Sequence, residues 1–213
     1  MKITEPRLAK NLNTEPQAVA NCFQKEDTEN LLCKNKDFRA VNVQHLSVQS
    51  CVFEGCNFGA CAMRESQFSD VIFRNCDLSN VNLQTCGFHR VQFIDCKLIG
   101  ANMSESTLYQ LLFSGCKAQY INLSQGKFRY VCFDDDDLRS GGLDSCKLEQ
   151  VEFVKCNLME AEFHRTPLSG INFTDSNITN LRVTALVENE LRGAVVSPQQ
   201  ALELAYLLGI VVR

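Results

Sequence analysis

The sequence predicts an all-β fold: a four-sided tube of short parallel strands, with about 20 residues per coil, followed by a C-terminal α-helix. Two repeats predict the tube. A large apolar residue returns every five residues, and a longer motif returns every twenty, as in VIFRNCDL (71–78), VQFIDCKL (91–98) and VEFVKCNL (151–158). A third observation, the apolar segment QQALELAYLL after Ser197-Pro198, predicts the helix.

The five-residue repeat runs without insertion or deletion from Phe38 to Val183, and every phenylalanine of the chain occupies its large apolar position, the centre. A small residue stands two places before most centres, and a polar residue stands between them. Small–polar–large is a three-residue strand whose first and third side chains share one face. The two remaining residues must turn the chain. Period five does not keep one face of a helix buried, so a helix is excluded here.

Four five-residue units return the pattern to its start, so equivalent residues stack about 4.8 Å apart in neighbouring parallel strands. One such column is Phe53, Phe73, Phe93, Phe113, Phe133, Phe153 and Phe173. One coil departs from the repeat. Its small inward positions hold Gly126, Asp136 and Gly141, and the small residue Ala118 stands at a centre, where a large apolar residue is usual. An unpaired buried carboxylate is unfavourable. We therefore expect either local distortion or a hydrogen-bonded carboxylate at Asp136.

The chain divides into three predicted segments: an N-terminal arm or cap (1–30), the tube (31–185), and a C-terminal capping and dimerisation helix with a short strand (186–213). Ser197 is a predicted N-cap and Pro198 the first helical residue. The helix carries more apolar side chains than one tube end can cover. We expect a homodimer joined through the C-terminal ends, and the alternative is a cap folded on its own chain. The expected dimer residues are Leu202, Tyr206, Leu207, Leu208 and Ile210.

Composition excludes several classes of protein. The net charge of −4 argues against general nucleic-acid binding. Charged residues interrupt the first twenty positions, so we expect no signal peptide, and no run approaches the length of a membrane span. We expect a cytoplasmic protein. The twelve cysteines are then expected to be reduced.

The sequence contains no recognisable motif for catalysis, metal binding or phosphate binding. Nine cysteines take the small inward position, where a thiol behaves as a small hydrophobe, and none forms a CxxC pair. His45, His89 and His164 occupy different places in the five-residue unit. No catalytic triad or phosphate loop is present. We expect no enzyme activity, no metal and no cofactor.

The sharpest charge feature is the run Asp134–Asp137. As an isolated signal it indicates a solvated turn. On the tube, however, it joins other aspartates on one side, where carboxylates could imitate duplex phosphates and bind a basic partner. Arg74, Lys97, Lys117 and Lys155 dilute this charge. The candidate acidic residues are Asp77, Asp95, Asp134, Asp135, Asp137 and Asp175.

The repeat resembles the A(D/N)LXX unit of the pentapeptide repeat family in VNLQT (81–85), ANMSE (101–105) and CNLME (156–160). The resemblance covers about residues 31–185 and implies a right-handed quadrilateral β-helix. The ending SPQQALELAYLLGIVVR and the opening MKITEPRLAKNL resemble Qnr-type quinolone-resistance members, notably chromosomal ones of Gram-positive bacteria such as enterococci.

The Qnr resemblance implies a DNA-mimicking homodimer that binds DNA gyrase or topoisomerase IV, without contacting nucleic acid or membrane, and protects them from fluoroquinolones. Many Qnr proteins carry projecting loops that help protection, and the unbroken register leaves no room for one here. We therefore expect topoisomerase inhibition with weaker drug protection. The alternative function is a scaffold or adaptor for another protein partner.

Overall fold

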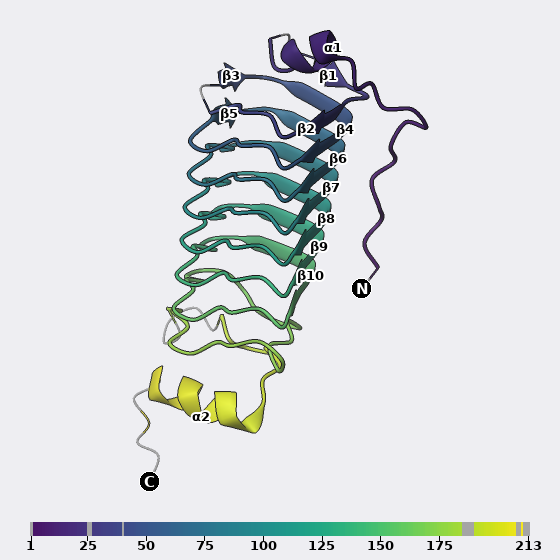
Figure 1. Cartoon of the computed structure of the whole chain (residues 1–213). Helices are drawn as coiled ribbons and strands as arrows, with labels where there is room; N and C mark the ends of the chain where they lie inside the picture. The colour runs from purple at the N-terminus through teal and green to yellow at the C-terminus, as the bar shows by residue number, and fades with distance from the viewer. Residues whose placement is uncertain (1, 25–26, 40, 185–189, 208–209, 211–213) are drawn as a thin grey trace.

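The computed structural model describes residues 2–24, 27–39, 41–184, 190–207 and 210. They form a parallel β-solenoid with helix α1 (Pro16–Ala20) at its N-terminal end and helix α2 (Pro198–Leu207) at the other (Figure 1). This confirms the predicted fold class. Neither helix of the described chain has the length and apolar composition of a membrane span.

The tube is built on one large parallel sheet. Its order is β1-β4-β6-β7-β8-β9-β10, with β2 also on β4, and a second sheet pairs β3 with β5. Phe53 pairs with Phe73, which pairs with Phe93, so the register advances by twenty residues as predicted. The strands are β1 (Asp27–Glu29), β2 (Leu32–Lys34), β3 (Asn42–Gln44), β4 (Ser47–Glu54), β5 (Ala62–Arg64), β6 (Gln67–Arg74), β7 (Gly87–Ile94), β8 (Thr107–Ser114), β9 (Lys127–Asp134) and β10 (Lys147–Val154).

We name the four sides by their centre residues: face 1 contains Phe88 and Leu108, face 2 Phe93, face 3 Leu98 and face 4 Met103. The sequence predicts four equal three-residue strands per coil. The structure instead joins faces 1 and 2 in eight-residue strands, because backbone pairing continues on both sides of the corner between them. The residue at that corner has a left-handed conformation, with φ 53° at Arg90. Faces 3 and 4 pair mainly through single bridges.

The interior is filled by ladders of side chains. The rings of the face 2 phenylalanines stack with centroids 5.0 Å apart between Phe73 and Phe93 and 4.8 Å apart between Phe113 and Phe133. These side chains are at most 2 % exposed. Burial of large apolar side chains in register is the main stabilisation of the tube.

Small inward residues complete the hydrogen bonding of the tube. The Cys96 thiol donates to the Phe73 carbonyl at 3.4 Å. Ser106 Oγ accepts from the Cys86 N–H and donates to the Leu83 carbonyl, both at 3.1 Å. These bonds explain why cysteine and serine recur at this position. All twelve cysteines are free thiols, and eleven are buried.

Asp136 shows the hydrogen-bonded arrangement that was one of the two expectations from sequence. Its carboxylate accepts the Cys116 N–H at 2.6 Å and the Asp134 N–H at 3.1 Å. The side chain is 2 % exposed. Burial disfavours the charged form more than these bonds stabilise it, and it raises the pKa of Asp136 to about 7.

The N-terminal segment forms an extended arm followed by a cap that contains α1. The arm runs along the tube beside the corner at which the long strands bend (Figure 1). Its Thr4, Arg7 and Ala9 N–H groups donate to Gln110 Oε1, Asp70 Oδ1 and Ser50 Oγ at 2.7, 2.7 and 2.8 Å. Those acceptors lie on three different coils at the corner between faces 1 and 2, so the arm clamps the coils to one another.

Helix α2 closes the C-terminal end of the tube. Gln200 N–H donates to Ser197 Oγ at 3.3 Å, and Ser197 N–H donates to Gln200 Oε1 at 2.8 Å, a reciprocal capping box. Ser197 is thus the N-cap, as predicted. Gln200 Nε2 also donates to the Phe173 and Ser176 carbonyls, both at 2.8 Å. One side chain therefore both starts the helix and fixes it to the last coil.

Candidate partner-binding surface

The structure places the six sequence-selected aspartates on one side of the tube, on faces 2 and 3 and their shared corner. Asp134 ends β9 on face 2, and Asp77 and Asp137 point outward from face 3. The other three, Asp95, Asp135 and Asp175, occupy the corner column and are exposed.

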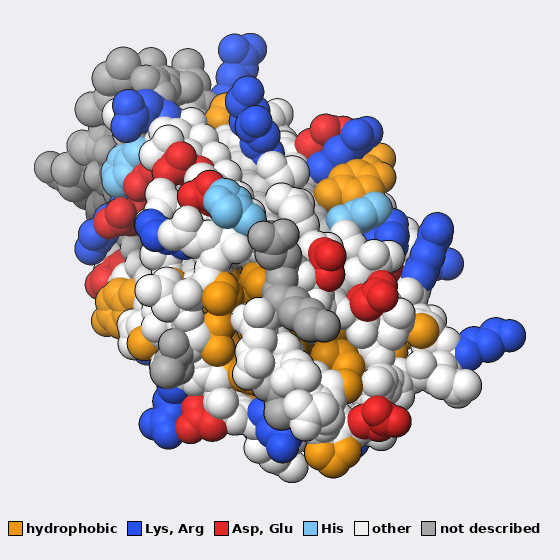
Figure 2. Space-filling model, turned by 90° about the horizontal axis from the view of Figure 1, so that it is seen from above, with side chains coloured by type: hydrophobic (Ala, Val, Ile, Leu, Met, Phe, Trp, Pro, Cys, Tyr) orange, Lys and Arg blue, Asp and Glu red, His pale blue; other side chains and the backbone are white. Residues whose placement is uncertain are grey.

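Two of these carboxylates are paired with cations. Asp77 lies 3.6 Å from Lys97 Nζ, and Asp137 lies 2.7 Å from Arg139 Nη2. Burial by itself would raise the pKa of both carboxyls, but hydrogen bonds and these cations outweigh it and lower both values. Figure 2, viewed from the N-terminal end, shows acidic and basic side chains interspersed around the rim. The negative potential of this side therefore depends on Asp134 and on the corner residues.

Backbone geometry explains part of the corner column. Asp95 and Asp135 have φ of 52° and 57°, and the same column holds Gly55, Asn75 and Gly115, also with positive φ. Glycine, asparagine and aspartate are the residues that best tolerate this conformation. The described residues offer no ion pair to Asp95, Asp135 or Asp175. Two coils separate successive aspartates, so exposed carboxylates recur roughly every 10 Å along the tube, and exposed Lys155 lies between Asp135 and Asp175 in the same column.

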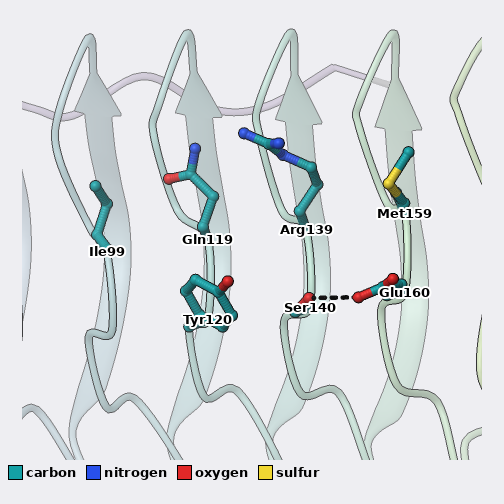
Figure 3. Close-up of a pocket in the computed structure, with 7 residues that line it drawn as sticks. All are labelled: Ile99, Gln119, Tyr120, Arg139, Ser140, Met159 and Glu160. Carbon is teal, nitrogen blue, oxygen red and sulfur yellow. Dashed lines mark hydrogen bonds between the residues drawn. The ribbon is translucent and has the colours of Figure 1, made fainter.

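A hollow of about 370 Å³ lies on face 3 at its corner with face 4, across face 3 from the acidic corner. Figure 3 shows side chains from four successive coils around it. Tyr120 is 67 % exposed and Ile99 is 37 % exposed. Ser140 Oγ donates to Glu160 Oε2 at 3.3 Å across one wall. An exposed aromatic ring beside aliphatic and charged side chains is typical of protein interfaces. The lining residues are Ile99, Gln119, Tyr120, Arg139, Ser140, Met159 and Glu160.

Asp137, one of the six aspartates, contacts two residues that line the hollow. It accepts hydrogen bonds from the Gln119 amide and the Arg139 guanidinium. Gln119 Oε1 is buried and has no hydrogen-bond partner in the described structure. A buried carbonyl oxygen without a donor is unfavourable.

The sequence analysis did not select the hollow. Ile99 and Met159 occupy the first turn position of their five-residue units, and Tyr120 occupies the second, with φ 60°. A bulky residue with positive φ is uncommon. Large apolar residues at turn positions, where polar or small residues are typical, were the sequence signal for this surface.

One group of described side chains on face 4 could hold a metal ion. Ligand atoms of Asp144, Glu162 and His164 lie within 4.8 Å of one another. The group is already satisfied internally, since His164 Nδ1 is 3.0 Å from Asp144 Oδ1 and Arg182 Nη1 donates to Glu162 Oε1 at 2.8 Å. A metal ion would have to displace Arg182.

The predicted dimer residues are only partly described. Leu202 and Ile210 are 45 % and 51 % exposed. The side chains of Tyr206 and Leu207, and the whole of Leu208, lie outside the described residues. Leu204 packs against the core of the tube. The helix thus has one face toward the tube and at least one large apolar side chain toward solvent.

The register, the ladders and the turn columns define a repeat protein of the β-solenoid class. The chain belongs to the pentapeptide repeat family: the model for the pentapeptide repeat region matches residues 66–143, and the model for pentapeptide repeats (8 copies) matches residues 143–178. A search of curated proteins gives no significant match.

Two solved structures are similar to this chain at low sequence identity. HetL, a pentapeptide repeat protein involved in heterocyst differentiation regulation in the cyanobacterium Nostoc, is 17 % identical, with TM-score 0.52 over 79 % of this chain and 84 % of HetL. QnrB1, a plasmid-mediated fluoroquinolone resistance protein, is 16 % identical, with TM-score 0.38 over 87 % of this chain and 99 % of its own. The HetL likeness supports the fold.

Proposed function

We propose that this protein is a cytoplasmic, non-enzymatic rod that binds a type II topoisomerase, DNA gyrase or topoisomerase IV, at the surface that otherwise holds DNA. The observation that carries the proposal is the exposed row of Asp95, Asp135 and Asp175 along a tube whose described residues 41–183 form no projecting loop. The resemblance of both chain ends to Qnr-type proteins supports the choice of partner.

The geometry supports competition with DNA more than drug protection. A tube with a fixed register holds the three corner carboxylates at set positions, so they can meet a basic saddle without ordering a flexible segment. Asp77 and Asp137 contribute less, because Lys97 and Arg139 already neutralise them. The unbroken repeat from 41 to 183 offers no loop to reach a drug site. We infer inhibition of supercoiling with limited protection from fluoroquinolones.

Asp95→Asn with Asp135→Asn is expected to weaken inhibition of gyrase supercoiling by about five- to tenfold, because two exposed charges that steer binding are lost. Asparagine tolerates the left-handed corner, so the fold is preserved. The matched control is Glu65→Gln with Glu105→Gln. These residues are also exposed, also two coils apart and also left-handed, with φ 57° and 58°, but lie at the diagonally opposite corner.

A supercoiling assay with increasing salt measures both effects. Inhibition by the wild-type protein should fall as salt rises, because exposed charges are screened over about 8–10 Å. Equal losses in the two double variants would contradict a role for the acidic corner. Unchanged supercoiling with excess protein at low salt would eliminate topoisomerase binding altogether.

We also propose that the protein is a homodimer joined through α2, in keeping with the two-fold symmetry of the enzyme. Leu202→Glu with Ile210→Glu is expected to give a monomer in sedimentation experiments, because charges would replace two exposed apolar side chains at the interface. Ala201→Glu, at a neighbouring exposed position of the same helix, is the control and should leave the dimer intact. A wild-type monomer at micromolar concentration would contradict the proposal.

A scaffold or adaptor function is the second candidate, and the Tyr120 hollow favours it. That surface offers the exposed Tyr120 ring and the exposed Ile99 side chain to a protein of any class. Binding there would depend little on salt. The salt response of the functional complex therefore discriminates the two candidates.

A further inference from the structure

A second hollow, of about 320 Å³, lies on face 1, opposite the Tyr120 hollow, over strands β8, β9 and β10. Its floor includes Leu148, a centre residue that is only partly buried. The other described centres of this column, from Val48 through Phe128 to Leu168, are at most 2 % exposed. One apolar core position is therefore open to solvent at this place.

Pro167 explains why the floor is open. In successive coils, the N–H at this position bonds the preceding coil, as Lys127 N–H does to Ser106 O and Lys147 N–H to Gly126 O, each at 2.9 Å. Proline has no N–H to donate. The described residues 167–175 make no backbone pairing with β10, which ends the large sheet. At the preceding centres of this column, a paired strand of the next coil shields the side chain from solvent. No such strand of the described chain shields Leu148.

Two ammonium groups border the hollow without a counter-charge. Lys127 and Lys147 are register partners on β9 and β10, both outward and exposed. No ion pair to either is present in the described part of the chain. Like charges directly opposite on neighbouring strands are unfavourable. An anionic group bound between them would relieve that repulsion.

The opposite wall is a guanidinium held against aromatic rings. Arg129 lies 6.0 Å from the Tyr109 ring centroid and 5.3 Å from that of Tyr130. Its Nε is 3.0 Å from Glu149 Oε1. The four charged residues of the hollow thus leave two net positive charges around an apolar floor.

We propose that this face 1 hollow binds an acidic peptide segment, placing carboxylates on Lys127 and Lys147 and one apolar side chain on Leu148. The volume is that of a small binding pocket, and the charges and floor complement such a segment. A nucleic acid strand fits less well, because three cations do not form the long basic track that backbone binding needs. The proposal is independent of topoisomerase binding.

The test uses the full-length protein and three fluorescein-labelled probes: a glutamate-rich peptide with one central leucine, its lysine-rich counterpart, and oligo(dT). Fluorescence anisotropy measures binding. Lys127→Glu with Lys147→Glu is expected to weaken binding of the glutamate peptide by about tenfold. The control is Lys97→Glu with Lys117→Glu, an exposed register pair on the opposite face with the same charge change, and it should alter binding by less than about twofold.

Saturable binding of the glutamate peptide, lost in the face 1 variant and kept in the face 3 control, would support the proposal. The proposal is wrong if the wild-type protein does not bind this peptide, or if both double variants weaken it equally. Tighter binding of oligo(dT) than of the peptide at the same salt would also overturn it, and would assign the surface to nucleic acid.

Discussion

Asp136→Ser is expected to flatten the dependence of stability on pH and to stabilise the protein at pH 8. The folded-state pKa of Asp136 is raised to about 7, while an unfolded aspartate titrates near 3.8. The folded chain therefore holds a proton that the unfolded chain releases between these values. Stability from this group is fully present below about pH 4 and is lost as the pH rises through about 7. The full difference corresponds to about 4 kcal/mol.

Serine is the appropriate replacement because the same column already contains one. Ser176 Oγ accepts the Cys156 N–H and donates to the Phe153 carbonyl, both at 3.0 Å. Serine at 136 can make the equivalent bonds without a charge. It gives up the second bond, from the Asp134 N–H, so the gain at pH 8 should be somewhat below 4 kcal/mol, the order set by the pKa difference.

Denaturant unfolding at pH 5 and pH 8 measures this effect. The difference between variant and wild type removes the contributions of the three histidines, which both proteins share. Asp135→Asn removes the neighbouring, exposed charge and should keep the wild-type slope. If Asp136→Ser and wild type show parallel pH profiles, Asp136 is already ionised in the folded protein at pH 5, and burial does not raise its pKa.

The repeat allowed most of the tube to be predicted. A centre every five residues fixes which side chains point inward, and the structure buries Phe53, Phe93 and Phe133 as that spacing requires. The exact register of twenty predicts that Phe53 lies beside Phe73. Such a pattern is readable because each coil contacts only its neighbours.

Features that depend on contacts outside the repeat were not predicted. Thr4 bonds to Gln110, 106 residues away, and no local pattern encodes the path of the arm along the corner. The strand that continues through Arg90 depends on cooperative pairing across a corner. The sequence did contain a signal for the open edge of β10, because Pro167 stands where other coils donate an N–H. That the missing pairing leaves Leu148 partly exposed became clear only from the structure.

The candidate site was predicted in part. The columns place Asp95, Asp135 and Asp175 in one line, as the sequence indicated. The sequence could not show that Asp137 is bound by Gln119 and Arg139, because side-chain conformation decides these contacts. Partner binding by the acidic residues stays a prediction.

Gly126→Ala is expected to destabilise the protein by about 1–3 kcal/mol through overpacking. A Cβ at 126 would lie 2.4 Å from Phe128 Cε1 and 2.9 Å from the Leu123 carbonyl oxygen. Phe128 is 2 % exposed, so its ring has little space to move. The glycine therefore makes room for the ring, rather than supplying conformational freedom to the backbone.

Two further variants isolate the cause. Gly126→Ala with Phe128→Leu should recover much of the loss, because the preceding coil combines Ser106 with Leu108 at the same two positions. Gly141→Ala is the control: its column already holds Ala101 and Ala161, and its contacts are 3.0 Å to the Leu138 carbonyl oxygen and 3.3 Å to Ile121 Cγ2. It should change the unfolding free energy by less than about 1 kcal/mol. If both alanine variants destabilise equally, or if the leucine gives no recovery, the Phe128 ring is not what excludes a side chain at 126.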